Sequence, residues 1–266
     1  MDLELRDKTA IVTGGSRGIG KAIARALASE GVDIAIVARN RATLEATAKE
    51  LARETGRRFV AISADTGKDE DVRTMVREAA ATFGHIDILV NCAAQPGGQA
   101  PPPKLAEITD SHFEGDMNVK VMGYLRCARE VAPYMRQQGW GRIINISGLA
   151  ARQTGTIIGS MRNVAVVALT KNLAEELGPY GINVTVIHPS TVRTEKTPGV
   201  IANQAQRLGI SPEEVERRMT ESNLIRRIVD ARDIAHIATF LASPKSVAIN
   251  GDVIAAGGGT PRSIYY

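Results

Sequence analysis

The sequence predicts an α/β protein built on a single doubly wound parallel sheet of about seven strands, with helices on both faces. Three observations lead to this prediction. Apolar runs of strand length alternate with stretches of helical periodicity from end to end of the chain. A glycine-rich turn, Gly14 to Gly20, separates the first apolar run from the first helical stretch. Hydrophobic residues make up 44% of the chain and aromatic residues only 4%, which is typical of a parallel sheet packed with aliphatic side chains.

The predicted elements follow from these periodicities. Seven apolar runs are the predicted strands: 9–12, 33–38, 59–62, 86–90, 142–146, 182–187 and 252–256. Seven amphipathic stretches are the predicted main helices: 19–30, 41–55, 68–83, 104–113, 114–137, 158–177 and 231–242. The segment 190–228 is polar and is predicted to be irregular, apart from a helix that opens at Ser211-Pro212. No repeat or linker interrupts the alternation, so one domain over residues 1–266 is expected.

The turn from Thr13 to Gly20 predicts a dinucleotide site. A strand-like run leads into it, and a helical pattern with Ile19, Ile23 and Leu27 on one face leads out of it. Glycines let the backbone approach a pyrophosphate, and a helix N-terminus offers free N–H groups and the positive end of the helix dipole. The alternative is a glycine-rich turn without a ligand. The sequence pattern clearly predicts a strand before the turn and a helix after it, which favours the nucleotide.

Two arginines favour NADP(H) over NAD(H). An NAD enzyme is expected to place Asp or Glu about 20 residues past the glycines, to bind the ribose 2′-hydroxyl. Arg39 stands at that strand end, whereas Asp33 lies at the opposite end of the strand. Arg39 and Arg17 offer bidentate contacts to a 2′-phosphate, although both could be ordinary surface arginines. Asp65, after the third strand, is either an acceptor for an adenine amino group or a turn residue.

Composition argues against several other classes of function. The net charge of +4 comes from basic residues scattered along the chain, and the few aromatic residues leave little for base stacking, so no nucleic acid is expected as a partner. No apolar run has the length of a membrane span, and the first residues lack the apolar core of a signal peptide, so a cytoplasmic protein without membrane contact is expected. Cys92 and Cys127 have no metal-ligand spacing, so no metal site is expected.

A series of short motifs stands in a fixed order along the chain: Gly14, Gly18 and Gly20, Asp65, Asn91-Cys92-Ala93-Ala94, Asn118, Ile146-Ser147, Pro189, Ile249-Asn250-Gly251 and Gly257-Gly258. With these motifs the chain resembles the short-chain dehydrogenase/reductase family, of the type similar to 3-oxoacyl-ACP reductases, over almost its whole length. The resemblance implies a Rossmann-type NAD(P)-binding domain, a substrate-lid insertion at about 190–228, a small-molecule substrate and a homotetramer or homodimer.

The resemblance also implies roles for single residues. Asn91 would tie the sheet to the cofactor side, Asn118 would hold a proton-relay water, and Ser147 would bind the substrate carbonyl. Pro189 to Thr194 would flank the nicotinamide. The expected cofactor contacts are Gly14, Ser16, Arg17, Gly18, Ile19, Gly20, Arg39, Asp65, Thr66, Asn91, Ala93, Asn163, Pro189, Val192 and Thr194.

One part of the family pattern is missing. The family's proton transfer uses a Tyr-x-x-x-Lys pair on the helix after the serine strand. The run Ala165 to Thr170 aligns with the continuation of that helix and places Gly159 at the tyrosine position and Asn163 at the lysine position. Tyrosines occur only at 124, 134, 180, 265 and 266, and none is followed by lysine four residues later. Loss of a positioned acid–base group costs about 10²–10⁴-fold in rate.

Other residues are candidates for the proton donor. His188 precedes Pro189 at a strand end and would titrate near neutrality, although it could be a polar strand-end residue without a catalytic role. Ser147 polarises a carbonyl but is a poor acid, and Arg162 can stabilise an oxyanion without releasing a proton. The leading hypothesis is therefore an NADP(H)-dependent oxidoreductase with an atypical proton route. The alternatives are a catalytically silent nucleotide-binding or partner subunit, and a non-redox elimination or isomerisation in the same pocket.

Overall fold

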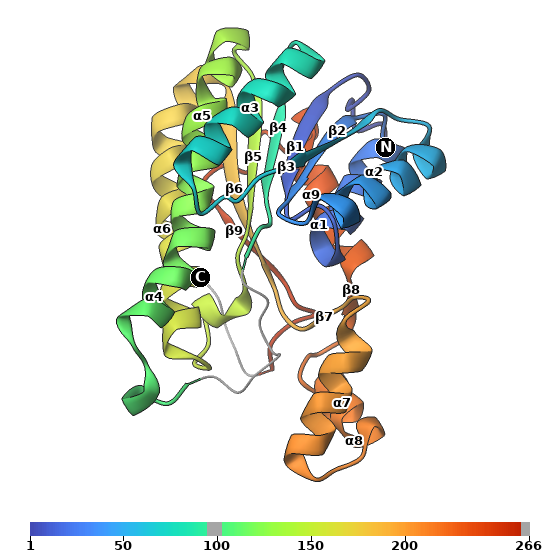
Figure 1. Ribbon diagram of the computed structural model, residues 1–266, viewed down its shortest axis with the longest axis vertical. Coiled ribbons are helices and arrows are strands. Elements are labelled where there is room, and N and C mark those ends of the chain that lie inside the picture. The colour runs from blue at the N-terminus through green and yellow to red at the C-terminus, as the bar shows by residue number, and fades with distance from the viewer. Residues whose placement is uncertain (95–102, 262–266) are drawn as a thin grey trace.

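The computed structural model describes residues 1–94 and 103–261 and contains a seven-stranded parallel sheet of order β3-β2-β1-β4-β5-β6-β9 (Figure 1). This confirms the predicted α/β fold. The strands of the sheet are β1 (Thr9–Thr13), β2 (Asp33–Ala38), β3 (Phe59–Ser63), β4 (Ile88–Asn91), β5 (Gly141–Ile146), β6 (Ile182–Pro189) and β9 (Val253–Ala256). Among the described residues, no helix has the length and apolarity of a membrane-spanning segment.

Helices cover both faces of the sheet (Figure 1). One face carries α1 (Gly18–Ser29), α2 (Arg41–Thr55) and α9 (Ala231–Ala242), and the other carries α3 (Asp69–Phe83), α5 (Gly123–Gln138) and α6 (Ile157–Leu177). Successive side chains of a strand point to opposite faces, so Ala10 and Val12 of β1 pack in one core cluster and Ile11 packs in the other. Each β–α unit thus buries its apolar side against the sheet.

The strand order reverses between β1 and β4, and their carboxyl ends therefore flank a crevice where α/β proteins bind ligands. Thr13, at the end of β1, joins the two strands at this point. Its Oγ1 accepts hydrogen bonds from the main-chain N–H groups of Cys92 (3.1 Å) and Ala93 (3.2 Å). The glycine turn after β1 and the residues after β4 are thereby held together.

The prediction of an irregular segment at 190–228 was wrong for much of its length. After β7 (Val192–Arg193), two helices, α7 (Thr197–Leu208) and α8 (Pro212–Glu221), form a hairpin that stands apart from the sheet before β8 (Val229–Asp230) pairs with β7 (Figure 1). The hairpin has a small core of its own around Ile201, Ala205 and Val215. These apolar residues are few and widely spaced, which is why the segment looked polar throughout.

The helical stretch before β5 also divides differently from the prediction. Helix α4 (Asp110–Met117) passes through a π-helical turn, Asn118–Met122, directly into α5. A π turn adds one residue to the turn and is often found at functional sites. Short 3₁₀ turns complete the described structure at Leu105–Glu107, Leu149–Ala151, Gly178–Tyr180 and Pro244–Ser246.

Candidate active site

The glycine turn between β1 and α1 is shaped by close backbone approach. Gly14 has φ +67°, and a Cβ on it would lie 2.9 Å from the carbonyl oxygen of Cys92. A Cβ on Gly20 would lie 2.3 Å from the carbonyl oxygen of Gly14. The main-chain oxygen of Ser16 accepts from Thr47 Oγ1 at 3.2 Å, which anchors the turn to α2. Only glycine fits at positions 14 and 20, as a phosphate-binding turn requires.

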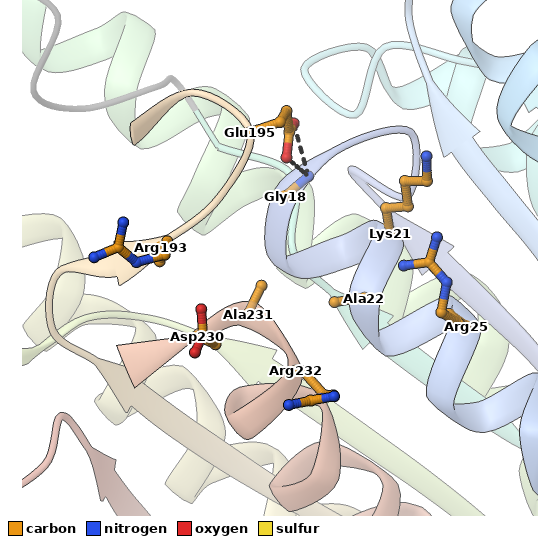
Figure 2. Close-up of a pocket in the computed structure, with 9 residues that line it drawn as sticks. All are labelled: Gly18, Lys21, Ala22, Arg25, Arg193, Glu195, Asp230, Ala231 and Arg232. Atoms are coloured by element: carbon orange, nitrogen blue, oxygen red, sulfur yellow. Dashed lines mark hydrogen bonds between the residues drawn. The ribbon is translucent and has the colours of Figure 1, made fainter. Parts of the chain in front are cut away.

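A carboxylate lies at the N-terminus of α1. Glu195 accepts the Gly18 N–H with both carboxylate oxygens, at 3.1 and 3.2 Å (Figure 2). Thr194, next to it in the chain, has its methyl group 3.5 Å from where a Cβ on Gly18 would lie. The first N–H groups of a helix have no acceptor within the helix, and this one is open to an anion. Thr194 thus lies close to Gly18, and its predicted contact with the cofactor stays a prediction.

Figure 2 also shows the groove beside this contact, a cavity of about 460 Å³ between α1, β7 and the start of α9. Its basic side chains are largely engaged in ion pairs. Lys21 and Arg25 pair with Glu50, and Arg193 pairs with Glu216. The groove thus borders the turn without offering free positive charge at these three residues.

The two arginines predicted to favour NADP(H) are both exposed. Arg39 follows the last residue of β2, and its guanidinium has no partner within residues 1–94 and 103–261. Arg17 stands in the turn, with Nη2 3.5 Å from Thr43 Oγ1. Asp65 forms a turn in which its Oδ1 accepts the Gly67 N–H at 2.9 Å. This contact is the turn role that the sequence left open for Asp65, and it leaves the adenine role untested.

A chain of buried hydrogen bonds between side chains runs beneath the crevice. Buried Asn91, at the end of β4, donates from Nδ2 to Asn145 Oδ1 at 3.0 Å, and Asn145 donates in turn to Thr170 Oγ1 at 2.9 Å. Asn91 Oδ1 is buried without a hydrogen-bond partner among the described residues. Asn91 therefore ties β4 to β5, while its predicted role toward the cofactor stays a prediction.

Ser147, Asn163 and Lys120 meet at the carboxyl end of β5. Ser147 Oγ donates to the main-chain oxygen and to Oδ1 of Asn163, both at 3.2 Å. Lys120 Nζ donates to the same Asn163 Oδ1 and to the main-chain oxygen of Ser147, both at 3.1 Å. All three side chains are buried, and Lys120 is only 4% exposed. The structure thus joins two predicted site residues and adds a third.

Lys120 was missed by the sequence analysis, although a signal was present. It precedes Tyr124 by four residues and Cys127 by seven, which puts it on the face that α5 buries. Burial, followed by the nearby Arg162 guanidinium, lowers the pKa of Lys120 to about 7. An amine that exchanges its proton near neutral pH therefore lies beneath Ser147.

Gly159 lies one turn before Asn163 on α6. A Cβ on Gly159 would lie 2.2 Å from Thr156 Oγ1. This hydroxyl caps the helix by accepting the Gly159 N–H at 3.0 Å. The Thr156 side chain therefore takes the space next to Gly159.

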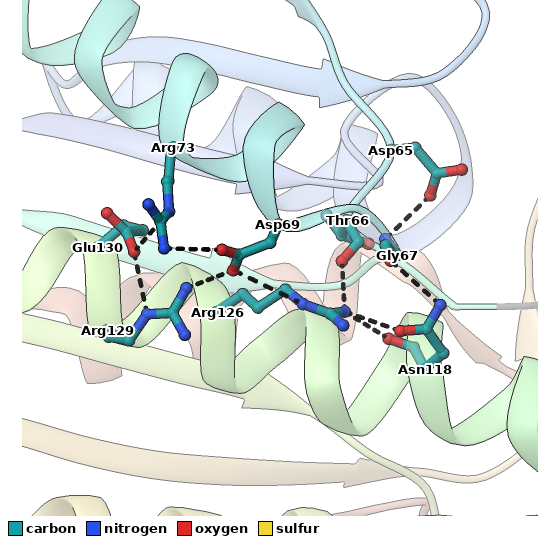
Figure 3. A network of polar contacts seen from close by, with 9 residues as sticks. All are labelled: Asp65, Thr66, Gly67, Asp69, Arg73, Asn118, Arg126, Arg129 and Glu130. Carbon is teal, nitrogen blue, oxygen red and sulfur yellow. Dashed lines mark hydrogen bonds and ion pairs between the residues drawn. The ribbon is translucent and has the colours of Figure 1, made fainter.

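The Asn118 side chain, at the start of the π turn, belongs to a polar network with Gly67 and Arg126 (Figure 3). Its Nδ2 donates to the Gly67 carbonyl at 3.1 Å, and its Oδ1 accepts from Arg126 at 2.8 Å. Arg126 also donates to the main-chain oxygen of Thr66 and lies near Asp69, which pairs with Arg129. No contact joins Asn118 to Ser147 in the described part of the chain, and its predicted water-holding role stays a prediction.

His188 is fully buried in β6. Its Nδ1 accepts the Gly148 N–H at 3.1 Å, so a neutral ring carries its hydrogen on Nε2, which has no partner among the described residues. Burial, and then the charge of Arg152, lowers the pKa of His188 to about 4. The expectation that it titrates near neutrality was therefore wrong, and its catalytic role stays a prediction.

The Arg162 guanidinium pairs with Asp116 of α4, and the Arg162 side chain is only 16% exposed. The cofactor contacts of the remaining residues stay predictions, and the structure gives only their positions in the fold. Ile19 is in the first turn of α1, Pro189 ends β6 and Val192 begins β7.

Comparisons with known proteins agree with this arrangement. Residues 14–260 match the family described as enoyl-(acyl carrier protein) reductase. The chain is 35% identical over 257 residues to the short-chain reductase protein NovJ of Streptomyces niveus, covering 96% of this chain and 95% of the relative. It is 30% identical over 264 residues to the 3-oxoacyl-[acyl-carrier-protein] reductase FabG of Staphylococcus epidermidis, covering 95% and 98%.

Among solved structures, the chain is similar to L-sorbose reductase from Gluconobacter frateurii complexed with NADPH and L-sorbose. The TM-score is 0.93 at 28% identity, and the match covers 99% of this chain and 100% of the other. The family match spans nearly the whole described fold, including the glycine turn and Ser147. This chain belongs to the short-chain dehydrogenase/reductase family and is an oxidoreductase of carbonyl or alcohol substrates.

Proposed function

We propose that this chain is an NADP(H)-dependent oxidoreductase that reduces a small carbonyl compound, or oxidises the matching alcohol, without a Tyr-x-x-x-Lys pair. The observation that carries the proposal is the Ser147–Asn163 hydrogen bond at the carboxyl end of β5. It holds the Ser147 hydroxyl, which would donate to a substrate carbonyl, against α6, the helix on which the family pattern expects tyrosine and lysine. Gly159 and Asn163 occupy those two positions in the alignment.

The turn after β1 fits the phosphates of a dinucleotide. The Glu195 carboxylate on Gly18 is an anion at the place where a pyrophosphate would bind, which supports an anion site at this helix N-terminus. Gly14, Ile19 and the main chain around them would hold the pyrophosphate, and Arg17 and Arg39 would hold a 2′-phosphate. The bound cofactor supplies the hydride chemistry. The NADPH complex of the similar L-sorbose reductase is consistent with this preference.

Ser147 has the central role toward the substrate. In the structure its hydroxyl donates to Asn163, and on substrate binding we expect it to turn and donate to the carbonyl oxygen instead. Asn163 keeps an amide Nδ2 that can donate to a ribose hydroxyl, although it carries no charge to lower a neighbour's pKa. The α7–α8 hairpin, which follows β6 through β7, would cover the substrate as a lid.

We further propose that the protein is a homodimer or homotetramer. Ile157, Met161 and Val164 follow one another at helical spacing on α6 and are 48%, 49% and 51% exposed. A stripe of exposed apolar side chains along one helix would suit a contact surface between subunits.

The test is a comparison of binding and turnover. Titration of the purified protein with NADPH and NADH, followed by cofactor fluorescence, should give the tighter dissociation constant for NADPH. A panel of small ketones, aldehydes and sugars with NADPH should then reveal turnover. Tight NADPH binding without turnover of any panel member would favour the catalytically silent subunit. Equal affinity for the two cofactors would contradict the proposed preference.

A further inference from the structure

We propose that Lys120 holds the proton of this active site and returns it to Ser147, in place of the Tyr-x-x-x-Lys pair. The inference rests on the proposed function above and concerns a residue outside the family's pattern of functional positions. Lys120 would not touch the substrate itself. It is a positioning residue that acts through Ser147.

A shared acceptor links the two residues. Asn163 Oδ1 accepts from Lys120 Nζ at 3.1 Å and from Ser147 Oγ at 3.2 Å. When the Ser147 hydroxyl turns to a substrate carbonyl, Lys120 still satisfies this buried oxygen. A buried acceptor left without a donor is unfavourable, so Lys120 makes the turn of Ser147 easier.

The amine is also fixed in place. Its second hydrogen bond, to the main-chain oxygen of Ser147 at 3.1 Å, holds Nζ against the same residue that carries the reacting hydroxyl. An ammonium group has three N–H donors and a neutral amine has two. The two acceptors present are therefore satisfied in either protonation state, so loss of a proton leaves neither acceptor unsatisfied.

The charged and titratable groups around Lys120 come from four elements. Arg162 of α6 lowers the pKa of Lys120, whereas Asp116 of α4 and Cys92 after β4 act in the opposite direction. His188 of β6 lies close enough for the charge of Lys120 to lower its pKa. The outcome, with burial as the main cause, is a pKa of about 7 for Lys120.

The other titratable groups nearby are poorly suited to exchange a proton at neutral pH. Burial raises the pKa of Cys92 to about 11 and lowers that of His188 to about 4. Tyr124, a buried phenol, donates to the Ile146 carbonyl at 2.9 Å, and burial raises its pKa well above the ordinary value. Lys120 remains as the group whose protonation changes near neutrality.

The proposed proton path balances in the reducing direction. The bound cofactor would supply the hydride to the carbonyl carbon, and the π electron pair would move onto the carbonyl oxygen. This oxygen would take the proton of the Ser147 hydroxyl. Once Ser147 Oγ no longer donates to the shared acceptor Asn163 Oδ1, it would take a proton from the Lys120 ammonium. The neutral amine of Lys120 then regains a proton from water. In the oxidising direction each transfer runs backwards.

The test compares K120M and K120R with K49M, a control at an exposed lysine of α2. For reduction, wild-type kcat should fall as the pH rises through about 7, because the ammonium form is lost. K120M should lower kcat by about 100-fold or more with KM changed by less than about threefold. K120R keeps the charge but cannot release a proton. It should therefore also lower kcat, and its kcat should not fall further as the pH rises through about 7. K49M should match the wild type.

A second readout does not depend on activity. In lysine-labelled protein without cofactor, NMR should show one lysine side chain titrating near pH 7, present in K49M and absent in K120M. If K120M fails to fold, the kinetics of K120R and the lysine titration of the wild type decide whether Lys120 has the proposed role. Two results would overturn the role of Lys120 while leaving the proposed function in place. One is a kcat of K120R or K120M within about threefold of the wild type with the same pH profile. The other is the absence of a lysine that titrates near pH 7. Absence of wild-type turnover overturns the proposed function together with the role of Lys120.

Discussion

The two carboxylate oxygens of Glu195 lie 3.1 and 3.2 Å from the main-chain nitrogen of Gly18, at the N-terminus of α1. The residues are far apart in the sequence, and the contact forms because β7 leads the chain back to the glycine turn. A carboxylate at this place uses the same N–H group and the same helix dipole that a pyrophosphate would use. We therefore expect Glu195 to compete with the proposed cofactor.

Removal of this carboxylate should strengthen NADPH binding. A carboxylate at a helix N-terminus contributes about 0.3–1 kcal/mol, so E195A should lower the Kd by about two- to fivefold. Fluorescence titration of NADPH measures this change. E176A, at an exposed glutamate of α6, should leave the Kd unchanged. A Kd that is unchanged or higher in E195A would show that Glu195 does not compete.

Reversal of charge at Arg39 should change the cofactor preference. The exposed Arg39 guanidinium would make charge-assisted hydrogen bonds to a 2′-phosphate, worth about 1.5–3 kcal/mol. R39D should weaken NADPH binding by about 10- to 100-fold and leave NADH binding similar or tighter. R53D, with the same charge change on the exposed side of α2, is the control. Equal losses for both cofactors would show that Arg39 does not contact the 2′-phosphate.

The fold could be predicted because its signals are local. The structure gives α2 the same bounds as the sequence did, because the Asn40 side chain caps its first turn and Gly56, with φ +69°, ends it. By contrast, α7 has few apolar residues and depends on its packing against α8. No local sequence pattern predicts this packing.

The chemistry of the site was harder to predict, because its contacts join distant elements. The family pattern predicts Ser147 and Asn163 as site residues, because it fixes their positions in the sequence. Lys120 could be predicted as a site residue only if one knew that the π turn and α5 bury one face beneath β5. Its spacing to Tyr124 indicates burial only when that face is known. The Glu195 contact with Gly18 has no sequence signal, since it depends on the course of the chain after β6.

The buried His188 should make stability depend on pH in the acid range. Its pKa is about 4 in the folded protein and about 6.5 when unfolded, so the unfolded chain binds the extra proton first. Its contribution is fully present above pH 6.5. It is lost as the pH falls toward 4, by at most about 3 kcal/mol.

Denaturant unfolding at several pH values tests this. H188N keeps an acceptor for the Gly148 N–H and removes the titration, so its free energy of unfolding should fall less than that of the wild type between pH 6.5 and 4. H236N, at an exposed histidine of α9, should follow the wild type. Equal slopes for H188N and the wild type would contradict the assigned pKa.

A charge in the exposed stripe of α6 should dissociate the proposed oligomer. Met161 lies between Ile157 and Val164, and a buried arginine without a partner at this place would disfavour association strongly. M161R should reduce the molar mass from light scattering to that of a monomer. L208R, at an exposed apolar residue of α7, should keep the wild-type mass. A wild-type mass for M161R would place any subunit contact elsewhere.

Restoration of lysine at position 163 should be unfavourable while Lys120 is present. Asn163 Oδ1 accepts from Lys120 Nζ, and N163K would replace this acceptor by a second buried ammonium group. Loss of the hydrogen bond and repulsion between the two amines should destabilise N163K by about 1–3 kcal/mol. The double variant K120M/N163K should recover much of this loss, because one ammonium remains.

A double-mutant cycle of the free energy of unfolding measures the coupling between the two positions. For K120M and N163K we expect a coupling energy of about 1 kcal/mol or more, whereas N172K, on the exposed side of the same helix, should be additive with K120M. Additivity within about 0.3 kcal/mol for N163K would mean that the two positions do not interact. If the coupling is found, G159Y and N163K cannot rebuild the family's site by themselves. Lys120 would also have to be removed, and Thr156 would have to leave the space beside position 159.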